Sequence, residues 1–386
     1  MSILNYTDPI IAKNLNKIDE WIKKKKEISK PPFYTSTDIR VSENKVVAVD
    51  TNIFPAGFNN LSNYFLKKSA KNIKMYIEKL NLPVERILII PELHTRNPFY
   101  WDNIIAIKKM FEIAGILSDV GLIVDDGTNF MIEFDSTSDL KVKATTVDKS
   151  NNKVFVNDFM PDLILINNDF STHFPNILKD IDQPVIPPVE VGWHSRRKNI
   201  HFDFYNSLVD EFCKIFNMDS NIFQLKTELI KNINVEENED RSKVANIINE
   251  LKSKIGSDQN IFIKSNSGTY GMSVMQVNEG SQFVNLNRSG KKKMKVSKGG
   301  KLFSDLIVQE GVDSIFGKKE PVYYLIDCEV SGAFYRVNDN KSSRDNLNTR
   351  GMYFDPISES GLNPTISIIS QIGSLATGLE IQHLTK

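Results

Sequence analysis

Short apolar runs alternate with longer amphipathic segments over the first 200 residues of the chain. The predicted strands cover residues 46–49, 86–90, 122–124 and 162–166, and the predicted helices cover residues 62–80 and 97–115. A hairpin-like stretch over 130–157 lies between the last two strands. β-Branched runs that alternate with helices are typical of an α/β layer built on a mainly parallel sheet.

The pattern changes on both sides of this region. Asp8-Pro9 is a favourable helix start, and the lysine run 23–26 that follows reads as a solvated helix end. Residues 203–255 are predicted to be mostly helical, with an exposed polar loop over 234–241. A strand-rich region then covers 261–354, and Asn363-Pro364 begins a final apolar helix. The chain is therefore predicted to be α/β first and α+β in its C-terminal part.

Composition excludes several classes of protein. A length of 386 residues suggests two or three domains, and equal numbers of basic and acidic residues, 48 each, argue against a dedicated nucleic-acid binder. Two distant cysteines, Cys213 and Cys328, fit neither a disulfide framework nor a zinc site. With no signal-peptide core and no long apolar run, we expect a cytoplasmic protein without membrane contact. The P-loop, dinucleotide, zincin and nucleophile-elbow motifs are all missing.

A glycine-containing segment offers a site for phosphate. Three apolar β-formers lead into Lys264, and a flexible loop follows. Glycines let successive N–H groups turn toward an anion, and a lysine at a strand end can reach the same anion. The candidate phosphate-binding residues are Lys264, Ser265, Gly268, Thr269, Tyr270 and Gly271. A structural hairpin with incidental glycines is the alternative interpretation.

The strand at 306–312 is the next candidate. It ends in polar residues and a glycine, so its backbone groups at Gln309, Glu310 and Val312 could bind adenine between two sheets. A plain buried strand followed by a turn would explain the same pattern.

A polar ribbon at 323–338 is the third candidate. A two-residue turn at Ser331-Gly332 would place four polar side chains on one face of a hairpin, because side chains alternate along a strand. On that register Asp327, Glu329 and Asn338 would hold Mg²⁺, and Arg336 would face a transferring phosphoryl group. Cys328 would point to the core. A solvated edge hairpin with an Asp–Arg pair is the alternative.

These three segments, in this order, resemble the ATP-grasp superfamily, and more closely the bacterial ATP-grasp-type glutamate–cysteine ligases. The resemblance is carried by residues 49–61, 90–97, 192–202, the Lys264 loop, 308–312 and 327–352. Two positions depart from it, Ser273 where relatives often have glycine and Asn199 where serine is expected. Superfamily members usually end with an acidic-x-Asn metal strand, whereas this chain ends with an apolar helix. The metal ligands would then come from 327–338, or from Asn346 and Asn348.

The resemblance implies a domain order. It implies an α/β substrate domain at 1–202, a helical segment at 203–255 and an ATP-grasp nucleotide-binding and catalytic domain at 256–386. It also implies ATP and Mg²⁺ as cofactors, with Lys264 and Arg336 as catalytic residues. The implied reaction joins the γ-carboxyl of L-glutamate to the amine of L-cysteine through an acyl phosphate, the first step of glutathione synthesis.

Amino-acid substrates carry carboxylates, which arginine binds through its planar fork. We therefore expect Arg96 and one of Arg196 or Arg197 to bind substrate, with structural arginines as the alternative. Asn52, with Asp50 and the pair at 59–60, could hold a substrate amine or fix the turn at 55–57. The partners are small molecules, and a homo-oligomer is compatible with the sequence. Another ligase of this type, such as a glutathione synthetase, and a non-catalytic nucleotide-binding module are the competing functions.

Overall fold

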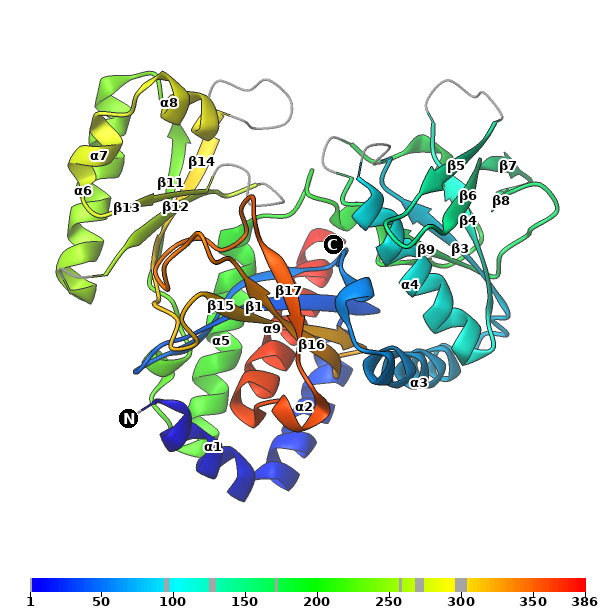
Figure 1. Ribbon diagram of the computed structural model, residues 1–386, viewed down its shortest axis with the longest axis horizontal. Helices are drawn as coiled ribbons and strands as arrows, with labels where there is room; N and C mark the ends of the chain where they lie inside the picture. The colour runs from blue at the N-terminus through cyan, green and yellow to red at the C-terminus, as the bar shows by residue number, and fades with distance from the viewer. Residues whose placement is uncertain are drawn as a thin grey trace.

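The computed structural model describes residues 2–93, 97–124, 130–170, 173–256, 259–267, 274–295 and 304–386. The three larger β-sheets of the described residues, with their helices, form three lobes, and the lobe with the five-stranded sheet lies between the other two (Figure 1). The α/β class predicted from the periodicity is confirmed.

The central lobe contains a five-stranded antiparallel sheet built from both ends of the chain. Its order is β17-β16-β15-β1-β2, with bounds Tyr34–Val41 (β1), Val46–Asn52 (β2), Lys319–Ile326 (β15), Glu329–Val337 (β16) and Tyr353–Pro356 (β17). One face is covered by helices with bounds Leu4–Lys13 (α1), Leu15–Ser29 (α2), Lys198–Phe216 (α5) and Pro364–Leu384 (α9) (Figure 1). The first and last segments of the chain therefore share one hydrophobic core.

The second lobe carries the mainly parallel sheet predicted for the N-terminal region. Its order is β10-β9-β3-β4-β6-β5, and only the β5–β6 pair is antiparallel. The strand bounds are Arg86–Pro91 (β3), Leu117–Leu122 (β4), Met131–Asp135 (β5), Lys141–Thr146 (β6), Leu163–Asn167 (β9) and Val185–Ile186 (β10). Helix Asn63–Lys79 (α3) leads from β2 of the central sheet into β3, and helix Pro98–Ala114 (α4) connects β3 to β4. A small hairpin, Asp148–Ser150 (β7) with Lys153–Phe155 (β8), is attached.

The third lobe is a four-stranded antiparallel sheet with order β11-β14-β12-β13. Its strands are Thr227–Ile233 (β11), Ile261–Ser265 (β12), Val274–Val277 (β13) and Ser304–Glu310 (β14). Helices Asn238–Ile255 (α6), Gly280–Val284 (α7) and Arg288–Lys295 (α8) accompany it. Strand β11 was not predicted, because it lies in a stretch that was taken as helical. Strand β1 precedes the first predicted strand and was not predicted either.

Local chemistry explains several helix ends. Ser62 accepts a hydrogen bond from the Phe65 amide at the start of α3, and Gly115 ends α4 with a φ of 80°. Asn363 caps α9 by accepting from the Ile366 amide, as its sequence predicts. The prediction that a helix begins at Asp8 is wrong, because α1 already begins at Leu4.

The predicted hairpin turn at 331–332 is also wrong. Strands β15 and β16 pair Ile326 with Glu329, so the two-residue turn is Asp327-Cys328, and Tyr324 pairs with Gly332 inside the ladder. Asp327 and Cys328 both have positive φ, 50° and 64°. This register places the turn at the far end of the hairpin from Arg336, which pairs with Glu320.

The strand pairing differs from the predicted division of the chain. β1 pairs with β15, so the five-stranded sheet joins residues on both sides of the boundary at 202. The third lobe begins at β11, before the predicted boundary at 256. None of the helices in the described ranges is long and apolar enough to cross a membrane.

Candidate functional site

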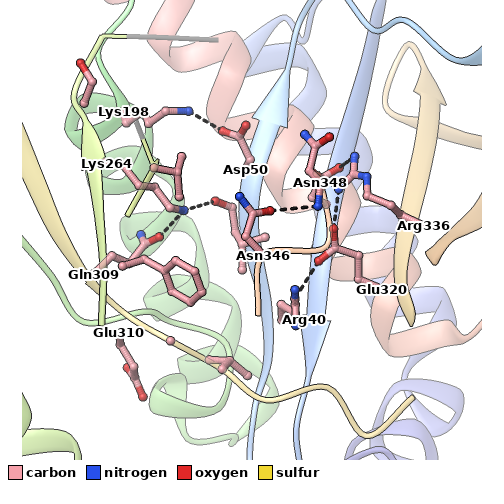
Figure 2. A pocket seen from close by; sticks show the side chains of 17 residues that line it. Arg40, Asp50, Lys198, Lys264, Gln309, Glu310, Glu320, Arg336, Asn346 and Asn348 are labelled. Carbon is pink, nitrogen blue, oxygen red and sulfur yellow. Dashed lines mark hydrogen bonds and ion pairs between the residues drawn. The ribbon is translucent and has the colours of Figure 1, made fainter. Parts of the chain in front are cut away.

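A cavity of about 100 Å³ lies between the central sheet and the third sheet. Figure 2 shows the polar side chains that point into it from both sides. Its lining residues are Asp38, Arg40, Val49, Asp50, Lys198, Phe262, Lys264, Ser265, Val274, Gln309, Glu310, Gly311, Val312, Glu320, Arg336, Asn346 and Asn348. Lysine, glutamine and carboxylate groups from different lobes thus face one shared pocket.

Lys264 enters this cavity from β12. Its Nζ donates to the Gln309 Oε1 at 2.7 Å and to the Val49 carbonyl at 3.1 Å, which ties the third lobe to β2 of the central sheet (Figure 2). Burial lowers the pKa of Lys264 to about 8, although the charge of Asp50 opposes this shift. The predicted loop residues Gly268, Thr269, Tyr270 and Gly271 lie outside the described residues.

A second lysine, Lys198, faces the cavity from the start of α5. Its Nζ lies 2.8 Å from the Asp50 Oδ1 and 4.7 Å from the centre of the Trp193 ring. Burial would raise the pKa of Asp50, but the charges of Lys198 and Lys264 outweigh it and lower the pKa to about 2. Asp50 is therefore a carboxylate held ionised between two ammonium groups.

Arg336 lies in a row of buried charges across the central sheet. Its Nη1 is 2.8 Å from the Asp38 Oδ2 and 2.5 Å from the Glu320 Oε1, and Arg40 Nε contacts the other Glu320 oxygen at 2.7 Å. Burial raises the pKa of Asp38, with Arg336 opposing it. The two carboxylates raise the pKa of Arg336 against the effect of burial, so the guanidinium stays charged.

The residues predicted to hold metal do not reach this cavity. Asp327 contacts Lys79 and lies 3.1 Å from the Lys26 Nζ, and Glu329 lies 2.8 Å from the same ammonium. Lys26 is thus an ion-pair partner rather than part of a solvated helix end. Asn338 is fully buried and donates to backbone carbonyls of the following loop. That metal prediction assumed a turn at 331–332. The observed pairing of β15 with β16 contradicts this turn.

An acidic-x-Asn sequence does occur in the central sheet, at the opposite end of the chain. It is Asp50-Thr51-Asn52 on β2, where Asp50 pairs directly with Asp38 of β1. Alternation along the strand points Asp50 and Asn52 to the same side, and Thr51 packs toward Gly373 of α9. No group of three His, Cys, Asp or Glu residues that could hold a metal is found in the described ranges.

A second pocket opens beside the first and shares four residues with it, Asp38, Asp50, Arg336 and Asn348. Its other lining residues are Ser36, Asn52, Phe54, Pro55, Ala56, Gly57, Asn59, Asn60, Asn97, Phe99, Tyr100, Asn103, Asp169, Trp193, Val322, Tyr324, Phe334, Met352 and Phe354. The predicted substrate residue Asn52 is among them. The shared residues mark the place where molecules in the two pockets would meet.

The predicted substrate arginines are not brought together here. Arg196 and Glu380 are buried to 2% and 1% exposure, and the Arg196 Nε and Nη2 lie 2.9 and 2.8 Å from the two Glu380 oxygens. The prediction that Arg196 binds a substrate carboxylate is not supported, since this carboxylate already occupies its fork. Arg197 donates to the carbonyls of His194 and Arg196 and lines neither pocket. Arg96 lies outside the described residues.

Of the predicted nucleotide residues, Lys264, Ser265, Gln309, Glu310 and Val312 line the first cavity. The Glu310 carboxylate accepts hydrogen bonds from the Lys45 Nζ at 2.9 Å and from the Lys226 amide. Its side chain therefore stabilises the end of β14.

The sequence reasoning missed Lys198, Asp38 and Glu320. Lys198 was noticed only as part of a basic triplet. Strand β2, which pairs with the strand of Asp38, carries the acidic-x-Asn pattern. That pattern was the one available signal, but it was expected near the C-terminus.

The comparisons with known proteins agree with one another on a family. A family model described as GshA, glutamate–cysteine ligase, matches residues 8–371. A candidate gamma-glutamylcysteine synthetase from Methylobacillus flagellatus KT is 27% identical, with a TM-score of 0.88 over 99% of this chain and 96% of that chain. No curated protein matches the sequence.

More distant solved structures are also similar. D-cycloserine synthetase DcsG is 10% identical, with a TM-score of 0.42 over 78% of this chain and 82% of its own. D-alanyl-alanine synthetase A from Vibrio cholerae O1 biovar eltor str. N16961 is 9% identical, with a TM-score of 0.38 over 75% and 80% of the two chains. These two likenesses are too weak to carry an argument about function.

Proposed function

Because this chain belongs to the glutamate–cysteine ligase family, we propose that it uses ATP to join the γ-carboxyl of L-glutamate to the amine of L-cysteine. The observation that supports this most is the meeting of two pockets at Asp38, Asp50, Arg336 and Asn348. One pocket carries lysines suited to phosphates, and the other carries amide and aromatic groups suited to amino acids. Phosphoryl transfer requires that the two reactants meet at one point.

A carboxylate is a poor electrophile, so the proposed reaction proceeds in two steps. A γ-carboxylate oxygen of glutamate attacks the γ-phosphorus of ATP, and the bond to the leaving ADP oxygen breaks. The cysteine amine then attacks the acyl carbon, phosphate leaves, and the amine loses a proton. Catalysis of such steps depends mainly on positioning and on stabilising charge.

The first cavity offers the groups that a triphosphate needs. Lys264 and Lys198 would bind phosphate oxygens from two lobes, and Arg336 would stabilise charge on the transferring group. The apolar side chains of Phe262 and Val274 would contact the base, near the strand end at 309–312.

Mg²⁺ fits the donors present. Asp50 and Asn52 on β2, with Asp38 on β1, offer oxygen ligands on one side of the sheet, and Mg²⁺ in such sites needs only one or two carboxylates plus substrate phosphates. When bound, the ion would neutralise charge on the β- and γ-phosphates. We therefore assign the metal site to these β1 and β2 residues in place of Asp327, Glu329 and Asn338.

Release of ADP tests the proposed function against its competitors. We expect ADP with glutamate plus cysteine, and little with γ-glutamylcysteine plus glycine or with no substrate. ADP formation only with the dipeptide and glycine would identify a glutathione synthetase instead. Nucleotide binding without ADP from any pair would favour a non-catalytic binding module.

ATP binding should take up a proton in mildly alkaline solution. The pKa of Lys264 is lowered to about 8 in the free protein, and a bound phosphate favours its charged form. The affinity for ATP should therefore fall as the pH rises through 8. Calorimetry at pH 8.5 in buffers of different ionisation enthalpy measures the proton uptake. The Lys264→Met variant should lose this uptake, and an unchanged value in that variant would exclude Lys264 as its source.

A further inference from the structure

Helix α5 begins at the first cavity but does not cap itself. Its first residue, Lys198, lines the cavity, and the residue before it, Arg197, forms no side-chain hydrogen bond to the amides of the first turn. The first N–H groups of a helix have no acceptors within the helix, so their acceptors come from elsewhere. In α5 a residue of the third lobe supplies them.

That residue is Asn266. Its backbone carbonyl accepts a hydrogen bond from the Lys198 amide at 2.9 Å, and its side-chain Oδ1 accepts one from the Asn199 amide at 3.0 Å. Its Nδ2 donates in return to the Asn199 Oδ1 at 2.7 Å. Three hydrogen bonds thus join one residue of the third lobe to the first turn of a helix in the central lobe.

Asn266 itself is well held in the third lobe. It directly follows β12, and its amide donates to the Asp305 carbonyl of β14 at 2.9 Å, which extends the pairing of these two strands. Asn266 is 2% exposed and lines neither pocket. Its side chain therefore contacts α5 and is not placed to contact a ligand.

The two lysines that point into the first cavity are held in different ways (Figure 2). Lys264 lies inside β12, which is paired with β13 on one side and with β14 on the other, so its backbone does not depend on the Asn266 side chain. Lys198 lies in the first turn of α5, and the ends of helices fray when their amides lack acceptors. Loss of the Asn266 side chain should therefore loosen Lys198 and leave Lys264 in place.

We propose that Asn266 is a positioning residue, which caps α5 from the third lobe and thereby holds Lys198 beside Lys264 for the phosphates of a nucleoside triphosphate. This role rests on the proposed use of ATP. Preorganising a cationic group reduces the ordering that binding requires, so the cap should raise the affinity for ATP. Asn266 acts through the position of Lys198 and not through a contact of its own with the nucleotide.

A double-mutant cycle on ATP binding tests this role, because residues that act as a unit give non-additive effects. Calorimetry measures the binding of ATP with Mg²⁺, without amino acids, to the unmodified protein, Asn266→Ala, Lys198→Met and the double variant. Lys198→Met should weaken binding about 10- to 100-fold, because a hydrogen bond to a charged group is lost. Asn266→Ala should weaken it about 3- to 10-fold, which lies within the range for a lost helix cap.

The decisive value is the effect of Asn266→Ala in the protein that already lacks Lys198. We expect less than about a twofold further loss there, because the residue through which Asn266 acts is gone. An equal loss with and without Lys198 would mean that Asn266 only supports the fold, and it would overturn the proposal, as would unchanged binding in Asn266→Ala. If Asn266→Ala does not fold, Asn266→Leu, which keeps most of the volume, replaces it in the cycle with the same outcomes.

Two further variants separate the cap from general weakening of the third lobe. Asn249→Ala removes a similar contact within that lobe, where the Asn249 Oδ1 accepts from the Gly280 amide at the start of α7, and it should change ATP binding less than about twofold. Asn266→Asp keeps an oxygen for the Asn199 amide and should bind ATP within about twofold of the unmodified protein. Binding as weak as that of Asn266→Ala in either variant would contradict the proposal.

The two proposals fail in different ways. Absence of ADP formation by the unmodified protein with glutamate and cysteine would refute the ligase function, and the binding cycle would still test Asn266. An active ligase with additive losses in the cycle would refute only the positioning role.

Discussion

The substitution Asp50→Asn should lower the turnover of ATP by about 10²- to 10³-fold, an effect of the size found when one group that stabilises transition-state charge is removed. The amide keeps the shape of the carboxylate but replaces a charged metal ligand with a neutral one, and it removes the charge that pairs with Lys198 at 2.8 Å. Because a weakened ligand set binds the ion less tightly, the Mg²⁺ concentration that gives half-maximal ADP formation should also rise. ADP release measured over a range of Mg²⁺ concentrations gives both values.

Asp327→Asn is the matched control for this experiment. Asp327 has the same side chain, but it lies at the β15–β16 turn between Lys26 and Lys79, outside both pockets. Its loss should change turnover less than about twofold, because Asp327 lines neither pocket. A large loss in Asp327→Asn with normal turnover in Asp50→Asn would reverse the assignment and restore the metal site predicted from the sequence.

The error at this hairpin has a clear physical origin. Ser331-Gly332 resembled a turn because glycine is common in turns, yet Gly332 lies inside β16. A Cβ there would come within 2.9 Å of side-chain atoms of Leu61 and Phe65, so the glycine permits close packing of the strand against its neighbours. The real turn uses two non-glycine residues at positive φ, and although Asp adopts this conformation more often than most residues, Cys gives no such signal.

Features set by neighbouring residues were predictable, and those set by distant pairing were not. The capped helices, the strand that carries Lys264 and the strand at 306–310 follow from local periodicity and capping chemistry. The position of Asp50 in the site depends on β1, which pairs with β15 almost 300 residues later. No local pattern shows that pairing, so the acidic-x-Asn strand was sought near the C-terminus and missed near the N-terminus.

Helix α9, near the C-terminus, also has a feature that is set by a distant residue and that local sequence does not reveal. The sequence predicted an apolar helix here, and the structure confirms it, with Ile369, Ile372 and Leu375 in the core. The sequence gives no sign that Glu380 within it is buried and paired with Arg196. That pair also reaches the site, since the Arg196 Nη2 lies 3.4 Å from the carbonyl oxygen of Thr51, the residue between Asp50 and Asn52.

Replacing Glu380 with alanine should lower the free energy of unfolding by about 3–5 kcal/mol, because Arg196 would keep a buried charge without its partner. Urea unfolding followed by tryptophan fluorescence measures this change, and Trp193, whose ring centre is 4.5 Å from the Arg196 guanidinium, lies beside the pair. Glu112→Gln, an exposed position on α4, is the control and should change the value by less than about 0.5 kcal/mol.

The contribution of Glu380 to the free energy of unfolding should be lost only as the pH falls. Burial opposes its ionisation, but the charge of Arg196 and the hydrogen bond from His201 lower the pKa of Glu380 from 4.5 to about 2. A group whose pKa is lowered by folding stabilises the protein above its unfolded pKa and loses this effect as the pH falls toward the folded value. The difference in unfolding free energy between the unmodified protein and Glu380→Gln should therefore be constant above about pH 5 and shrink between pH 4.5 and 2. A difference that stays constant down to pH 2 would show that Glu380 is not held as a buried carboxylate.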